Sequence, residues 1–178
     1  MVTSSTCWQC GAVLPVADDA GRADQLSSEA CFDAHGRVLA RCYEDAQLLG
    51  VRQLAVDAWA VQHPAPVSRV SDQSLALHLM TLHPFLEEGV DPEQGPALHK
   101  SMMIGRPDYA WLEPPPHRGT LTVADVSQPD RANLEAWARA AWQAWADHHA
   151  TVLGWVNRWR QSRPQPGAMH RSAHHAGQ

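Results

Sequence analysis

Two cysteines near the start of the chain, Cys7 and Cys10, are separated by two residues and followed directly by Gly11. This spacing is typical of a zinc knuckle, in which two thiolates reach one ion from a tight turn and glycine takes the strained position after it. A thioredoxin-like redox site would need an apolar strand before the motif and a helix after it. Pro15 follows soon after the motif, so the spacing favours metal binding, with thiol redox chemistry as the alternative.

A knuckle supplies half of a zinc site, and candidates for the other half lie on a predicted helix over residues 28–46. Serines precede this helix as good N-caps, Cys31 lies in its first turn, and His35 follows four residues later on the same face. Asp24 or a histidine from another segment is the alternative for the fourth position. His35 would then be an ordinary solvated residue on the helix surface. The predicted zinc ligands are Cys7, Cys10, Cys31 and His35.

A second group of residues could carry chemistry inside a helical bundle. Asp57 falls on an apolar helix face, where an unpaired carboxylate is costly, so it needs a histidine, an arginine or a metal ion as partner. His78, His148 and His149 lie on the shoulders of apolar stripes, where a histidine alone is typical of a satisfied core residue. If they converge on Asp57, they form a candidate catalytic group that holds a second divalent ion or acts as general acid and base.

The elements that must position these residues are helices with clear start and stop signals. Pro64 ends the second predicted helix, and His63 just before it is expected to complement the helix dipole rather than bind metal. Gly89 ends the third. The predicted helices cover residues 28–46, 51–63, 71–88, 92–103 and 134–159.

The last of these predicted helices dominates the apolar pattern. In an α-helix each residue is rotated by 100° from the one before it. This rotation places tryptophans and small apolar residues between Leu134 and Trp159 on one stripe of the helix surface. The sequence therefore predicts one long amphipathic, Trp-rich C-terminal helix, about 39 Å in length. The fold class is mainly α, a bundle of four to five helices with a small N-terminal zinc-knuckle segment.

Length and composition limit the classes of protein to consider. The 178 residues fit one domain, expected over residues 1–162 with the knuckle in about 1–35, and the aperiodic stretch 163–178 is expected to be a disordered tail. The net charge of −5 argues against nucleic acid as a partner. No apolar run reaches the roughly 18 residues that cross a membrane, and no signal peptide is recognisable. A cytoplasmic location follows as the expectation, where cysteines stay reduced.

Several short sequence motifs resemble those of an uncharacterised family of bacterial proteins, a domain of unknown function. The resemblance spans about residues 7–160 and brings no known activity with it. It implies that the three cysteines belong to the family pattern, whereas His35 does not clearly do so. The matching words are Cys7-Trp8-Gln9-Cys10-Gly11-Ala12, Cys31, Val56 to Pro64, Ala76 to Leu79, Trp111 to Pro115, Thr122 to Val126, and Trp145 to Trp155.

Three functions fit these residues. The first is a small metal-binding helical protein with a structural zinc site, which binds an unidentified small molecule or protein. The second is a metal-dependent enzyme that uses bundle histidines. Its layout is similar to DinB-like four-helix proteins, which hold one divalent ion with three histidines and catalyse thiol-dependent transfer or hydrolysis. The third is a thiol redox protein that uses Cys7 and Cys10. The sequence leaves open whether the protein is an enzyme.

Overall fold

Helices predominate in the residues that the structure describes, and one short sheet accompanies them there. The computed structural model describes residues 3–15, 26–104 and 107–163. Within these ranges the elements are mainly helical, which confirms the predicted fold class. The sheet is a hairpin in which β1 (Ser4–Thr6) pairs antiparallel with β2 (Val13–Pro15). The helices are α1 (Glu29–Glu44), α2 (Ala46–Leu49), α3 (Arg52–Gln62), α4 (Arg69–Glu87), α5 (Gly95–Met102), α6 (Arg131–Ala144) and α7 (His149–Ser162), with 3₁₀ turns η1 (Pro92–Gln94), η2 (Val123–Val126) and η3 (Ala146–His148).

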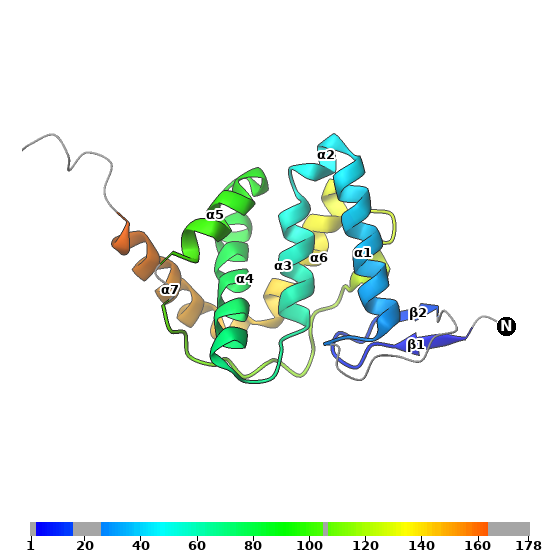
Figure 1. Ribbon diagram of the computed structural model, residues 1–178, viewed down its shortest axis with the longest axis horizontal. Helices are drawn as coiled ribbons and strands as arrows, with labels where there is room; N and C mark the ends of the chain where they lie inside the picture. The colour runs from blue at the N-terminus through cyan, green and yellow to red at the C-terminus, as the bar shows by residue number, and fades with distance from the viewer. Residues whose placement is uncertain (1–2, 16–25, 105–106, 164–178) are drawn as a thin grey trace, which may run out of the picture.

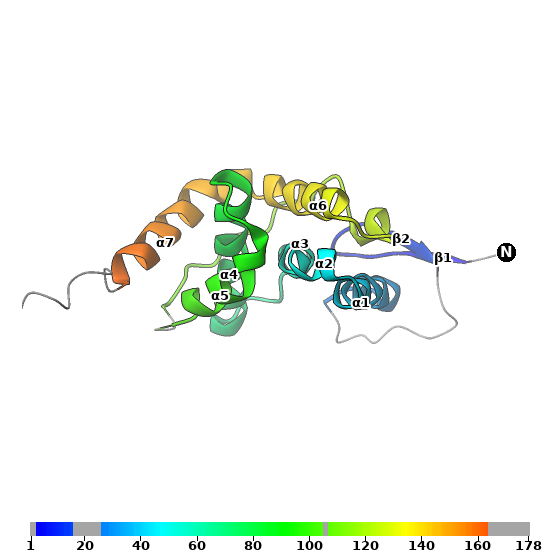
Figure 2. The same cartoon turned by 90° about the horizontal axis from the view of Figure 1, so that it is seen from above.

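The helices pack in two layers. Figure 1 shows α1, α3 and α4 side by side, with α5 next to α4. Figure 2, from above, shows α6 and α7 along one side of this row. Helix α6 packs on α3, and α7 packs on α4. The hairpin lies beside α1 at the end of the row (Figure 1). The start of α1 and the end of α3 therefore both lie near the hairpin.

Two tryptophans of α6 and Trp145 directly after it fill the interface between the two layers, and the indole N–H of each has an acceptor. Trp137, Trp142 and Trp145 are almost completely buried. Burying an indole removes a large apolar area from water but costs free energy unless its N–H is hydrogen-bonded. The three donor and acceptor pairs are Trp137 Nε1 to Gln62 Oε1 at 2.9 Å, Trp142 Nε1 to Glu87 Oε1 at 2.7 Å, and Trp145 Nε1 to the Val61 carbonyl at 3.2 Å.

The long helix predicted over residues 134–159 is not continuous. Helix α6 ends at Ala144, a 3₁₀ turn follows, and α7 begins at His149. The Trp145 amide donates to the Trp142 carbonyl in the tighter 3₁₀ pattern, at 2.9 Å. The His149 ring stacks on Trp142 with 3.8 Å between ring centroids, and its Nε2 lies 3.1 Å from the same carbonyl oxygen. This side chain thus takes an acceptor that a continuous helix would use for a backbone amide.

No helix in the described part of the chain is both long and apolar enough to span a bilayer. The tail predicted to be disordered, 163–178, lies outside the described residues except for Arg163. Asp24, an alternative metal ligand, also lies outside them.

Candidate metal centre

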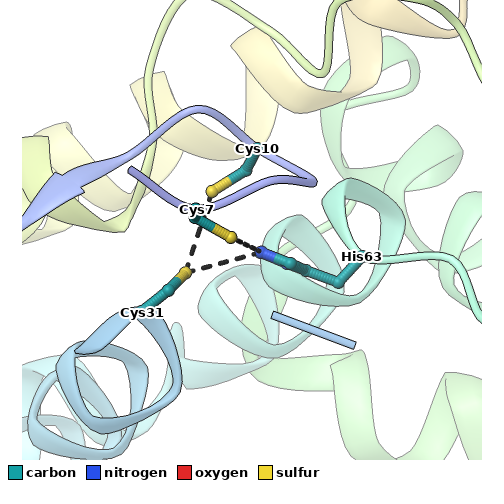
Figure 3. Close-up of side chains that lie close together, drawn as sticks. All are labelled: Cys7, Cys10, Cys31 and His63. Atoms are coloured by element: carbon teal, nitrogen blue, oxygen red, sulfur yellow. Dashed lines mark hydrogen bonds between the residues drawn. The ribbon is translucent and has the colours of Figure 1, made fainter. Parts of the chain in front are cut away.

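Three cysteines and one histidine from three separate segments meet at the hairpin. One ligand atom from each of Cys7, Cys10, Cys31 and His63 lies within 4.8 Å of the other three, and all four residues are buried. Figure 3 shows the four side chains directed toward one another. The sulfurs of Cys10 and Cys31 are 3.7 Å apart. His63 Nε2 lies 3.6 Å from the Cys7 sulfur and 3.5 Å from the Cys31 sulfur.

The loop of the hairpin brings the first two sulfurs together. The Cys7 amide donates to the Ala12 carbonyl at 2.8 Å, and the Gly11 amide donates to the Cys7 carbonyl at 2.9 Å. Gly11 has φ = 77°, a conformation that side chains other than glycine's rarely adopt. The Gln9 side-chain amide donates to the Pro64 carbonyl at 3.1 Å, which attaches the loop to the end of α3. These bonds hold Cys7 and Cys10 close to each other and to the end of α3.

Cys31 reaches the same point from the first turn of α1. The Ser28 hydroxyl caps this helix by accepting a hydrogen bond from the Cys31 amide at 3.3 Å. The cap fixes where α1 begins, and with it the direction of the Cys31 side chain, which is fully buried.

His63 completes the group from the residue after α3. Pro64 disfavours helical geometry at the preceding residue, so α3 ends at Gln62 and His63 leaves the helix path, with φ = −129° and ψ = 57°. The Trp59 carbonyl near the helix end accepts a hydrogen bond from His63 Nδ1–H at 2.7 Å. Because Nδ1 carries the proton, the lone pair of Nε2 faces the sulfurs. A backbone carbonyl on the second nitrogen is the usual support of a metal-bound imidazole.

Close contact between the three thiols perturbs their acidity. Hydrogen bonds from Cys10 and Cys31 hold the pKa of Cys7 far below its ordinary value, against the opposing effect of burial. Hydrogen bonds with Cys10 and, to a smaller extent, with Cys7 raise the pKa of Cys31 well above its ordinary value, and burial raises it further. Cys31 lowers the pKa of Cys10, but Cys7 and burial raise it more, to about 11. A divalent cation bound at this point would favour the thiolate form of all three cysteines.

His35, the predicted fourth ligand, is not a member of this group. Its ring stacks on Trp59 with 4.7 Å between centroids, and the His63 ring stacks on the same indole at 4.3 Å. Burial lowers the pKa of His35 to about 4, with a smaller effect from His63. His35 therefore packs behind the site as a neutral aromatic side chain. The sequence feature that could have pointed to His63 as a member of the group is its position directly before a helix-ending proline.

Comparison with family models covers most of the chain. One model, described as a family of unknown function, matches residues 5–146, a span that includes all four residues of the group. The chain belongs to DUF5946. This confirms the resemblance to an uncharacterised family. Comparison with curated proteins and with solved structures finds no match.

A second group lies in the helical row of this DUF5946 member. His78 Nδ1 is 2.7 Å from Asp57 Oδ1, so the sequence was right to expect a partner for the buried carboxylate. The third residue is His99 on α5, whose ligand atom also lies within 4.8 Å of the other two. Burial lowers the pKa of His99, and His78 lowers it further while Asp57 opposes the shift. Sequence reasoning missed His99, because α5 has no long apolar stripe that would indicate which face is inward.

His148 and His149 do not join Asp57 and His78. His148 Nε2 lies 2.9 Å from the Glu113 carbonyl oxygen. His149 contacts Trp142 at the break between α6 and α7. Both histidines thus hold backbone in place, so the convergence of all four candidates, which the sequence left open as the alternative to satisfied core histidines, does not occur.

Proposed function

We propose that Cys7, Cys10, Cys31 and His63 bind one zinc ion, and that this ion is structural. It would attach the β1–β2 hairpin to the start of α1 and the end of α3. Three thiolates and one imidazole form a common ligand set of structural zinc sites, in which four protein ligands fill a tetrahedron. The protein is then a zinc-stabilised helical protein, and the ion supports its fold rather than a reaction.

The observation that carries this proposal is the spacing of the ligand atoms. Zn–S bonds of about 2.3 Å and Zn–N bonds of about 2.0–2.1 Å place tetrahedral ligands roughly 3.8 Å apart for two sulfurs and roughly 3.5 Å apart for sulfur and nitrogen. The Cys10 and Cys31 sulfurs are 3.7 Å apart, and the two sulfur-to-Nε2 distances are 3.6 and 3.5 Å. These distances fit one ion at the centre of the group.

The small size of the hairpin supports a structural role. Its two strands have three residues each, and a hairpin of this kind is at best marginally stable in water. Ala12 and Leu14 are its buried apolar residues apart from the cysteines. Metal binding would therefore supply folding free energy that the hairpin cannot obtain from apolar burial. The need for reduced thiols supports a cytoplasmic location.

Thiol redox chemistry is the competing function for the same residues. All four cysteines are free, and the 3.7 Å between the Cys10 and Cys31 sulfurs is near enough for a disulfide to form after a small movement. Two features favour zinc. A redox pair needs two sulfurs and partial exposure, whereas this site combines three sulfurs with an imidazole and is buried.

Metal analysis of the purified protein tests the proposal. We expect one zinc ion per chain, measured by native mass spectrometry and elemental analysis. Cys31→Ser and His63→Ala should each release zinc at chelator concentrations that the wild type withstands. His35→Ala is the matched control, because His35 stacks on the same indole as His63 yet lies outside the ligand group. Wild-type protein with a disulfide and no zinc, or a His63→Ala variant with undiminished zinc affinity, would contradict the proposal.

A further inference from the structure

Three residues of the helical row form a second cluster, separate from the cysteines. Asp57 lies on α3, His78 on α4 and His99 on α5, and each brings one ligand atom within 4.8 Å of the other two. Asp57 is completely buried, whereas the two histidines are half-buried. The carboxylate thus lies at the bottom of the cluster, and the imidazoles lie between it and solvent.

The hydrogen bonds of the carboxylate are one-sided. His78 Nδ1–H donates to Asp57 Oδ1 at 2.7 Å, and the Gln53 side-chain amide donates to the same oxygen at 2.8 Å. Among the described residues, the buried Oδ2 has no hydrogen-bond partner. Native proteins rarely leave a buried carboxylate oxygen unpaired, so this atom indicates a ligand that donates to it or is positively charged.

The proton positions on both histidines follow from their neighbours. His78 Nδ1–H donates to the carboxylate, so an ion bound between these two residues would replace this proton and the neutral ring would carry its proton on Nε2. The Thr81 hydroxyl has one proton and donates it to the Leu77 carbonyl at 2.7 Å, so it accepts from His99 Nδ1–H at 3.2 Å. His99 therefore has one nitrogen fixed by an acceptor and the other free to coordinate, which is the arrangement that supports metal-bound histidines in proteins.

We propose that Asp57, His78 and His99 form a second metal site that binds a divalent transition-metal ion and keeps a coordination position open. Two imidazoles and one carboxylate suit borderline ions such as Zn²⁺, Fe²⁺ or Co²⁺ rather than Ca²⁺ or Mg²⁺. Three protein ligands leave at least one position for water, as in catalytic rather than structural sites. The ion would also satisfy the unpaired carboxylate oxygen.

The site is independent of the cysteine group. The two share no ligand, and Asp57 precedes His63 by six residues on α3 and the following turn. A hydrogen-bonded Gln53–Asp57–His78 network would account for part of the geometry without metal. It would not explain why Asp57 Oδ2 is buried without a hydrogen-bond partner, or why His99 approaches the same carboxylate.

Titration with Co²⁺ tests this site. The protein is purified with its cysteine-bound ion, labile metal is removed with a mild chelator, and Co²⁺ is added while absorption and metal content are followed. Because any accessible imidazole can bind Co²⁺, wild type and variants share a background with His170→Ala, His174→Ala and His175→Ala. We expect one added ion per chain, with ligand-field absorption of nitrogen and oxygen ligands and no thiolate charge-transfer band.

Single substitutions identify the ligands. His99→Ala removes an imidazole from a half-buried position and should weaken Co²⁺ binding by more than about a hundredfold, since loss of a supporting residue alone costs up to that much. Asp57→Asn should do the same, and circular dichroism checks its fold. His148→Ala is the matched control, because His148 is half-buried but bonds only a carbonyl. A wild type that takes up no added ion, or a His99→Ala variant with wild-type affinity, would overturn the proposal.

Discussion

The Nε2 atom of His63 lies 3.6 Å from the Cys7 sulfur, although 56 residues separate the two in the chain. Both residues lie where regular structure ends, Cys7 after β1 and His63 after α3. The contact joins the N-terminal hairpin to the middle of the helical row. Because both residues are buried and each is a good zinc ligand, an ion at this point would link the hairpin to the end of α3.

Removal of zinc should loosen the hairpin first. A strong chelator is expected to increase amide hydrogen exchange in residues 3–15 and at the start of α1, with little change in α6. A loss of about 3 kcal/mol would lower Tm by on the order of 10 °C. Exchange measured by mass spectrometry checks this, and added zinc should restore protection. Equal loosening of the hairpin and α6, or none in either, would argue against a structural ion.

Gly11→Ala should destabilise the knuckle by about 1–2 kcal/mol, since φ = 77° is unfavourable for a residue with a Cβ. The cause is backbone strain rather than a clash, because no described atom lies within 4 Å of a Cβ built at this position. Zinc affinity, measured by competition with a chromophoric chelator, should fall with it.

Gly36→Ala is the control for this strain. Gly36 lies inside α1 and also has space for a Cβ, so alanine there should stabilise the protein by up to about 1 kcal/mol. Two glycine-to-alanine changes with the same sign in urea unfolding would contradict the assignment of strain to Gly11.

The ion pair between α4 and α7 should make stability depend on pH. The Arg160 guanidinium, hydrogen-bonded to Glu88, holds the pKa of that carboxyl below its ordinary value, while burial opposes this and His83 assists. A lowered folded-state pKa stabilises the protein above the unfolded-state pKa, and this contribution is lost as pH falls through the folded-state value. Arg160→Ala should therefore cost about 0.5–1 kcal/mol near neutral pH and progressively less in acid.

Urea unfolding of wild type and Arg160→Ala across this pH range measures the difference. Arg158→Ala, an exposed arginine of the same helix, should show no such pH-dependent difference. A destabilisation by Arg160→Ala that is equal at neutral and acidic pH would show that packing rather than charge is responsible.

Local sequence determined much of this protein. The spacing of Cys7 and Cys10 with Gly11 specifies a turn that places two sulfurs close together, and this needs only neighbouring residues. The serine cap likewise fixes the start of α1, so the place of Cys31 in its first turn could be predicted. Helix boundaries followed from capping residues, prolines and glycines for the same reason.

Tertiary structure decided which residues complete each group. His35 and His63 were both available, and the packing of α3 against the hairpin places His63 at the sulfurs and His35 on Trp59. His99 joins Asp57 and His78 only because α5 packs against α4 and α3.

The break between α6 and α7 has the same kind of origin. The apolar period continues through it, but the Trp142 carbonyl accepts from the Trp145 amide in the 3₁₀ pattern and from the His149 side chain, not from the amide four residues on. Periodicity records which side of a helix is apolar. It does not record how neighbouring helices and side chains compete for a particular acceptor or ligand position, and that competition depends on distances between atoms far apart in the chain.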